Sequence, residues 1–163
     1  MATSKEYKEN TEYVKKVQEP MMAAYKTTKN TMLSGRPAYN MTPLEKMETM
    51  RLGFSKQDLE ALKSRTDLDY DKLSKALSVT RATLINKKGS EKFSSSLSEK
   101  IMSLADLYSY GYDVFEDEAK FNQWMFRPNK ALGGQAPYDV IDNQFGREEV
   151  KNIIGRIDYG VYS

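Results

Sequence analysis

The sequence predicts an all-α protein, and three observations support that prediction. Apolar residues recur every three or four positions in most segments, which is the period of an amphipathic helix. Few stretches alternate apolar and polar side chains with the period of two that marks a half-buried strand. Helix-capping residues, such as Thr42 and Ser55, stand in front of several periodic segments. A chain of 163 residues suits one domain, or two small domains that share a core.

The first forty residues predict an extension rather than a domain. Residues 1–40 are rich in Lys, Thr and Asn and hold few strongly apolar side chains. Tyr13, Val17 and Met21 keep a spacing of four, which predicts a marginal helix that is interrupted at Pro20. We interpret residues 1–40 as an N-terminal extension that is partly helical or mobile.

Two helices with explicit start signals follow the extension. Thr42 is the expected N-cap of the first, Pro43 takes its first helical position, and Glu45 completes a capping box. Gly53 is the expected end of this helix, and Ser55 caps the next one. The helix that Ser55 caps is predicted for residues 57–63. The remaining predicted helices cover residues 70–77, 80–88, 96–110, 116–125, 137–142 and 147–157.

Residues 69–89 have the spacing of a helix-turn-helix. Ala76 is small where two helices must approach, the connection is short, and Leu84 is placed to pack inward from the second helix. On the outward face, Arg pairs with guanine edges, Asn with adenine edges, and Thr or Ala with the thymine methyl group. Lys side chains and the helix N-terminus suit phosphate. The predicted DNA-binding residues are Thr80, Arg81, Ala82, Thr83, Asn86, Lys87, Lys88 and Lys92.

The turn of this motif departs from the usual composition at one position. Many helix-turn-helix sequences carry Gly where this chain carries Ser78. If Ser78 adopts a left-handed backbone conformation, it costs about 1 kcal/mol more than Gly would. Such a cost strains the turn without preventing it from forming.

Composition excludes several classes of protein. The chain has no cysteine, which excludes disulfides, thiol catalysis and Cys-type zinc sites. It also has no histidine, the usual general base and the commonest transition-metal ligand. We therefore expect no enzyme, no cofactor and no metal site. No apolar run is long enough to span a bilayer and Met1–Lys8 lacks the apolar segment of a secretory signal, so we expect a cytoplasmic protein without a membrane partner.

Charge is distributed unevenly along the chain. Residues 1–40 carry seven basic and four acidic groups, and residues 41–100 carry twelve and nine. Residues 101–163 carry six basic and ten acidic groups. A basic front and an acidic back suggest two surfaces with different partners, of which the front one suits a polyanion.

An acidic segment imitates the opening of a calcium-binding loop. Asp67, Asp69 and Asp71 have the right spacing, but the sixth position of the loop is Lys72 instead of Gly. The twelfth position is Ser78, where a calcium loop requires Glu. We therefore interpret Asp69 and Asp71 as residues that favour the start of a helix through its dipole.

The last forty residues carry the most specific pattern. Trp124 precedes a loop rich in Pro and Gly, and Val150, Ile153 and Ile154 then keep the spacing of a short amphipathic helix. The pattern resembles the C-terminal toxin-binding domain of Xre-type antitoxins, which are the partners of RES-domain toxins. The matching residues are Trp124, Pro128, Asn129, Leu132, Gly133, Gly134, Pro137, Arg156, Ile157, Gly160, Val161 and Ser163.

The resemblance implies an antitoxin of a type II toxin–antitoxin system. Residues 41–100 would form an Xre-like helix-turn-helix domain, followed by a small helical toxin-binding domain in residues 101–163. The toxin would be an NAD-consuming RES-domain protein encoded next to this chain, and residues 156–163 would block its NAD cleft. The expected toxin-binding residues are Trp124, Arg127, Asn129, Leu132, Gly133, Gly134, Arg156, Tyr159, Gly160, Val161, Tyr162 and Ser163.

The resemblance also implies repression of the chain's own operon. One helix-turn-helix reads too few bases alone, so a homodimer would bind an inverted repeat in operator DNA, within a larger toxin–antitoxin complex. A candidate dimer surface is the helix predicted for residues 96–110. The alternative role for its apolar side chains is the core of the single chain, and this remains the more economical interpretation.

A second hypothesis belongs to another functional class. The chain would be a stand-alone helix-turn-helix transcription regulator whose C-terminal domain binds a ligand or another partner. This hypothesis predicts tight operator binding and no effect on a toxin. An enzyme is the third class, and the missing His and Cys and the lack of any paired nucleophile and base disfavour it.

Overall fold

The computed structural model describes residues 37–160, and over this range the protein is all-α, as the sequence predicts. The expected extension, residues 1–40, lies outside the described range apart from its last four residues. The helices are η2 (Ala38–Asn40), α2 (Pro43–Leu52), α3 (Lys56–Thr66), α4 (Tyr70–Ala76), α5 (Arg81–Ile85), α6 (Ser95–Phe115), α7 (Glu118–Trp124), η3 (Lys130–Leu132), α8 (Pro137–Val140) and α9 (Gln144–Asp158).

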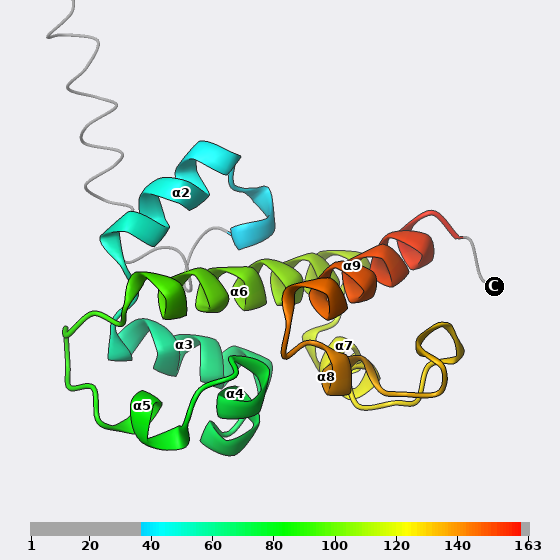
Figure 1. The fold of residues 1–163 in the computed structure, drawn as a ribbon. Coiled ribbons are helices and arrows are strands. Elements are labelled where there is room, and N and C mark those ends of the chain that lie inside the picture. The colour runs from blue at the N-terminus through cyan, green and yellow to red at the C-terminus, as the bar shows by residue number, and fades with distance from the viewer. Residues whose placement is uncertain (1–36, 161–163) are drawn as a thin grey trace, which may run out of the picture.

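The long helix α6 crosses the middle of the molecule, and the other elements pack around it (Figure 1). In the view of Figure 1, α2 lies above α6, whereas α3, α4 and α5 lie below its N-terminal half. The segment from α7 to α9 gathers around its C-terminal half. α6 therefore crosses the expected domain boundary at residues 100 and 101, and both halves of the described chain share it.

The predicted start signals of the first two helices are confirmed. The Glu45 backbone N–H donates to the Thr42 hydroxyl at 3.3 Å, and the Thr42 N–H donates to the Glu45 carboxylate at 2.7 Å. This is the expected capping box, with Pro43 in the first turn and Gly53 as the C-cap at φ +72°. Ser55 caps α3 through a second capping box with Asp58.

The acidic segment before α4 forms a helix start, as expected. The Asp69 carboxylate caps α4 by accepting a hydrogen bond from the Lys72 backbone N–H at 2.8 Å. This bond lowers the pKa of Asp69. Asp71 lies in the first turn of the same helix. Within residues 37–160, no group of three or more His, Cys, Asp or Glu residues is placed to hold a metal ion.

Several helices differ in length from their predictions: α3, α6 and α9 are longer, and α4, α5, α7 and α8 are shorter. α6 continues five residues beyond Tyr110 and contains Gly111. Gly is required at position 111 because the Phe121 ring packs against its backbone, and a Cβ there would lie 2.1 Å from that ring. α5 stops at Ile85, three residues before the predicted end. The next residues of the predicted helix, from Asn86 to Lys88, include no apolar side chain to hold a further turn.

The hydrophobic core is centred on α6. Its side chains Leu97, Ile101, Leu104, Ala105 and Tyr108 are all at most 5% exposed. These residues belong to the core of the single chain, so they offer no dimer surface on α6 and the more economical interpretation of them is confirmed. No helix of residues 37–160 is long and apolar enough to cross a bilayer.

A row of polar contacts joins α4 and the turn after it to the segment α8–α9. The Tyr138 hydroxyl donates a hydrogen bond to the Lys72 carbonyl at 3.0 Å, and Lys75 forms an ion pair with Asp139 at 3.0 Å. The Arg147 guanidinium donates to the Ala76 carbonyl at 2.8 Å, and the Ser78 hydroxyl donates to the Asp142 carbonyl at 2.7 Å. Because these contacts link segments more than sixty residues apart, the two halves of the described chain are fixed relative to each other.

Candidate functional site

The first candidate surface is the outward face of α5. α4 and α5 are joined by a short turn, Thr80 caps α5 by accepting a hydrogen bond from the Thr83 backbone N–H, and Leu84 is fully buried as predicted. Of the eight predicted DNA-binding residues, Lys87 is half-buried and the other seven are exposed. The fold therefore leaves the predicted set accessible on one short segment.

Two of the predicted DNA-binding cations have acidic neighbours. Arg81 Nη1 lies 3.1 and 3.2 Å from the two carboxylate oxygens of Asp71. Lys92 Nζ lies 3.8 Å from Asp58. All of these side chains are at least 25% exposed, so the pairs are weak and can be exchanged for other anions.

The second candidate surface is the loop between α7 and α8. Asn129 accepts two hydrogen bonds within this loop. Its side-chain oxygen accepts one from the Ala131 N–H at 2.9 Å, and its backbone carbonyl accepts one from the Gly134 N–H at 2.9 Å. Gly133 and Gly134 are exposed at φ +65° and +87°, with open space where a Cβ would be. The loop thus presents bare backbone.

The residues around this loop divide into supporting and exposed groups. Trp124 is half-buried and stacks on Phe121 with ring centroids 5.6 Å apart, while Leu132 packs against the core. Arg127 is exposed and lies 3.5 Å from the Gln123 side chain. Trp124, Asn129 and Leu132 therefore hold the loop in shape, which leaves Gly133, Gly134 and Arg127 as the exposed members of the predicted toxin-binding set around it.

The third candidate surface is a groove at the C-terminal end of α9, with a volume of about 670 Å³. We call it the C-terminal groove, and it is lined by Tyr39, Tyr110, Lys151, Asn152, Gly155, Arg156 and Tyr159. Two of these residues, Arg156 and Tyr159, are among the predicted toxin-binding residues. The next predicted residue, Gly160, is exposed, and Val161, Tyr162 and Ser163 lie outside the described residues.

Aromatic rings form one wall of the C-terminal groove. Tyr39 stacks on Tyr110 with ring centroids 4.4 Å apart and an angle of 21° between the planes. Burial raises the pKa of Tyr110, and the neighbouring Tyr39 adds to the shift. Gly155 allows the close approach of α9, because a Cβ there would lie 3.3 Å from the Tyr110 hydroxyl. Tyr159 is 82% exposed at the end of α9.

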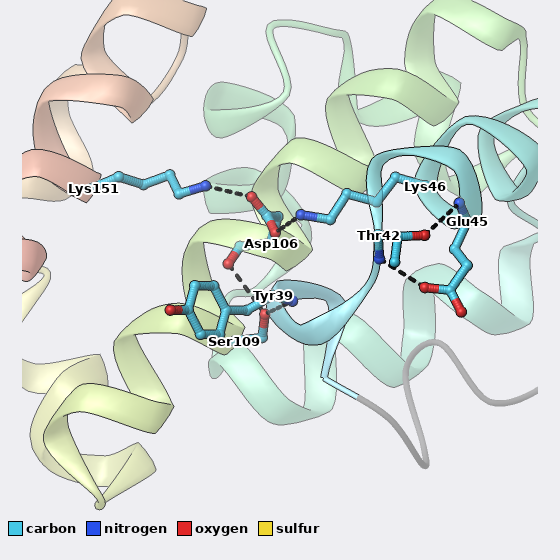
Figure 2. A network of polar contacts seen from close by, with 7 residues as sticks. All are labelled: Tyr39, Thr42, Glu45, Lys46, Asp106, Ser109 and Lys151. Atoms are coloured by element: carbon cyan, nitrogen blue, oxygen red, sulfur yellow. Dashed lines mark hydrogen bonds and ion pairs between the residues drawn. The ribbon is translucent and has the colours of Figure 1, made fainter.

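A buried carboxylate holds this region together (Figure 2). Asp106 on α6 lies between Lys46 of α2 and Lys151 of α9, with both ammonium nitrogens 2.5 Å from its oxygens. Figure 2 also shows Ser109, whose hydroxyl accepts a hydrogen bond from the Tyr39 N–H at 2.7 Å. The network therefore joins α2, α6 and α9, and it fixes the backbone that carries Tyr39.

The sequence predicted only two of the seven residues that line the C-terminal groove, Arg156 and Tyr159. Tyr39 belongs to the segment interpreted as an extension, and Lys151, Asn152 and Gly155 had no recognisable motif. Tyr110 had a signal, because it belongs to a dense set of tyrosines, whose polar tips are favoured at interfaces. The set consists of Tyr108, Tyr110, Tyr112, Tyr138, Tyr159 and Tyr162. Of that set, Tyr108, Tyr112 and Tyr138 are at most 9% exposed, which leaves Tyr110 and Tyr159 as the described members with accessible surface.

Comparison with known proteins gives a consistent result. Residues 111–160 match the family model of the antitoxin Xre/MbcA/ParS C-terminal toxin-binding domain. This range begins inside α6 and includes the loop after α7 and all of α9. It contains five of the seven residues that line the C-terminal groove, whereas Tyr39 and Tyr110 lie outside it.

Three curated relatives are similar to the chain. An Antitoxin Xre of Photorhabdus laumondii is 36% identical over 76 residues, which cover 46% of this chain and 51% of that protein. An Antitoxin Xre of Yersinia enterocolitica is 26% identical over 131 residues, 79% of this chain and 87% of that protein. A Prs ADP-ribosylating antitoxin of a Sphingobium species is 25% identical over 136 residues, 77% of this chain and 85% of that protein.

The match to the Photorhabdus relative spans about half of that protein's length, and the other two matches extend well beyond the C-terminal domain. The matched range 111–160 includes the exposed residues of the loop between α7 and α8 and those of α9. Residues 111–160 therefore form a domain of the Xre/MbcA/ParS toxin-binding type, and the chain is similar to Xre-type antitoxins of toxin–antitoxin systems.

Proposed function

We propose that this antitoxin binds an NAD-consuming RES-domain toxin, encoded next to it, and blocks the toxin's NAD cleft. The observation that carries the proposal is the match of residues 111–160 to a toxin-binding domain that ends on an exposed surface of α9. The name of the Sphingobium relative joins an antitoxin with ADP-ribosylation, a reaction that consumes NAD. A toxin of the ADP-ribosyl-transfer type fits that name.

The end of α9 is built to present a tail. Val150, Ile153 and Ile154 are at most 5% exposed and fix the helix against the core, so that its last turn is a rigid base. Beyond that base the chain turns at Gly160, whose φ is +69°, and continues into residues 161–163. We propose that these residues enter the NAD cleft and exclude NAD sterically.

Arg156 is placed to bind an acidic group of the toxin. Its guanidinium lies 3.3 Å from the Glu149 carboxylate, and the two side chains are 40% and 46% exposed. A pair this exposed contributes between about 0 and 1 kcal/mol, so its exchange for a toxin carboxylate costs little. The bare loop around Gly133 and Gly134 would form a second contact, in which toxin groups bind backbone.

We further propose that the α5 face represses the operon. A homodimer would place two copies of α5 on an inverted repeat, with Arg81 and Asn86 at base edges and Lys88 and Lys92 at phosphates. The seven exposed side chains of the predicted set support this assignment. The proposal assigns no catalytic step and no cofactor to this chain, and it places the complex in the cytoplasm, where the operator is.

Growth rescue tests the proposed function. The adjacent gene is induced alone, with the full chain, and with a chain that ends at Gly155, which lacks the last turn of α9. We expect toxicity of the neighbour alone, rescue by the full chain, and no rescue by the shortened chain. A harmless neighbour, or a full chain that gives no rescue, would favour the stand-alone transcription regulator instead.

A further inference from the structure

The C-terminal groove extends beyond the domain that the family model recognises. Tyr39 comes from η2 and Tyr110 from the C-terminal part of α6, and both precede residue 111. We propose that this groove is a second part of the toxin interface and that Tyr39 contacts the toxin directly. The inference rests on the proposed function, which it deepens by naming a surface outside the tail.

Tyr39 is held in place before any partner arrives. Its backbone N–H donates to the Ser109 hydroxyl, its ring stacks on Tyr110, and the preceding Ala38 is 2% exposed. Even so, 38% of Tyr39 remains accessible. A rigid, half-exposed aromatic side chain with a polar tip loses little conformational entropy on binding, which is why Tyr is favoured at interfaces.

The chemistry of the groove indicates what it accepts. Its wall is made of the Tyr39 and Tyr110 rings, and its edge carries the two cations Lys151 and Arg156. None of the described acidic side chains lines it. Residues 101–163 carry six basic groups against ten acidic ones. Lys151 is paired with the buried Asp106, whereas the pair of Arg156 with Glu149 is exposed, so Arg156 is the cation that a partner carboxylate can reach. The fitting occupant is an apolar side chain next to a carboxylate.

The toxin is a better occupant than a second copy of this chain or a nucleic acid. In a two-fold contact the same groove would face itself and bring its two cations against the same two cations, with no acidic side chain among the lining residues. The acidic surroundings disfavour a polyanion. The toxin instead would already lie next to the groove, because the tail that is proposed to enter its cleft follows directly from Tyr159 at the groove edge.

The test measures affinity between the full chain and the purified toxin encoded by the adjacent gene. We expect Tyr39→Ala to weaken binding about 10- to 100-fold, as loss of a central aromatic contact does, mainly through faster dissociation. Asn152→Trp is the second variant, because Asn152 is exposed at the groove and a bulky ring there blocks access without changing the core. It should weaken binding by a similar factor.

Leu44→Ala is the matched control. Leu44 is 76% exposed on α2 and does not line the groove, so its loss should leave the affinity for toxin within about twofold. Thermal unfolding of each variant separates loss of contact from loss of fold, and Asn152→Trp keeps the test valid if Tyr39→Ala unfolds.

Each other outcome overturns the inference in a distinguishable way. If Asn152→Trp and a folded Tyr39→Ala bind toxin as the unaltered chain does, while a chain ending at Gly160 does not, the interface is confined to the tail and the proposed function stands. If the variants change only self-association or only operator binding, the groove serves a second copy or DNA. If the unaltered chain does not bind the toxin, the proposed function fails and this inference with it.

Discussion

The hydroxyl of Ser78 donates a hydrogen bond to the carbonyl oxygen of Asp142 at 2.7 Å. Ser78 lies in the turn between α4 and α5 with φ +49°, a left-handed conformation that Gly adopts at lower cost. The hydrogen bond gives a physical reason for Ser at this position, because Gly has no side chain to reach the Asp142 carbonyl between α8 and α9. The turn between α4 and α5 is thereby fastened to the segment between α8 and α9.

Two substitutions separate the strain from the hydrogen bond. Ser78→Ala keeps the strained backbone and loses the bond, so we expect a loss of about 1 kcal/mol in the free energy of unfolding. Ser78→Gly loses the same bond but relieves about 1 kcal/mol of backbone strain, so we expect a change close to zero. Urea unfolding measures both, and an equal loss in the two variants would contradict this account of the turn.

We expect opposite effects on stability when Gly111 and Gly155 are each replaced by alanine. A Cβ at Gly111 would lie 2.1 Å from the Phe121 ring, which is fully buried and cannot move away. We expect Gly111→Ala to destabilise the protein by about 1–3 kcal/mol through overpacking.

The matched variant is Gly155→Ala. A Cβ there would lie 3.3 Å from the Tyr110 hydroxyl, at the end of a half-buried side chain that has room to shift. Because Ala favours a helix over Gly, we expect the stability to be unchanged or to rise by up to about 1 kcal/mol. Similar losses in thermal unfolding at both positions would show that the two sites are not packed as described.

The stability of the protein should fall at high pH. Burial raises the pKa of Tyr138 to about 12, and it raises the pKa values of Tyr108 and Tyr112 as well. In the unfolded chain these tyrosines ionise at about pH 10. Above that pH the unfolded state releases protons that the folded state keeps, so the stabilisation by Tyr138 is fully present below pH 10 and is lost as the pH rises through 12.

Urea unfolding between pH 9 and pH 12 measures this fall. Tyr138→Phe should be less stable near neutral pH, because it loses the hydrogen bond to the Lys72 carbonyl, worth about 0.5–1.5 kcal/mol. It should also show a shallower fall above pH 10, since one of the ionising groups is gone. A slope that is the same in both proteins would mean that Tyr138 does not contribute to it.

Asp71 should limit the affinity for the operator. Its carboxylate binds the Arg81 guanidinium, which the proposed function places at a base edge. We expect Asp71→Asn to raise operator affinity about 2- to 5-fold at low salt, because the exposed pair no longer competes with DNA. Arg81→Ala should lower affinity about 5- to 100-fold.

The double variant completes the cycle. If Asp71 acts only through Arg81, then Asp71→Asn has no effect once Arg81 is Ala. Binding to labelled operator DNA, measured at two salt concentrations, gives all four affinities. A gain from Asp71→Asn that persists without Arg81 would show that the carboxylate repels phosphate directly instead of holding Arg81.

Local features of the fold were predictable from the sequence, and long-range features were not. The predicted caps at Thr42 and Ser55 are confirmed because a cap is a hydrogen bond between residues three positions apart. The contact between Tyr39 and Ser109 joins residues 70 positions apart, and no local pattern encodes it. For the same reason, residues 37–40 appeared in the sequence as part of an extension.

The extent of α6 depended on tertiary packing. Gly111 ends a helix by its intrinsic preference, yet α6 continues through it because Phe121 packs against its bare backbone. The C-terminal groove was only half visible for a similar reason. Arg156 and Tyr159 belong to a recognisable C-terminal pattern, whereas Tyr39 and Lys151 reach the groove through contacts with α6.

Inhibition of NAD consumption tests the central claim most directly. The purified toxin is titrated with the full chain and with a chain that ends at Gly160, which keeps every described residue and lacks only residues 161–163. We predict complete inhibition at equimolar full chain, and binding without complete inhibition for the shortened chain. Equal inhibition by both chains would contradict the claim that the tail blocks the NAD cleft.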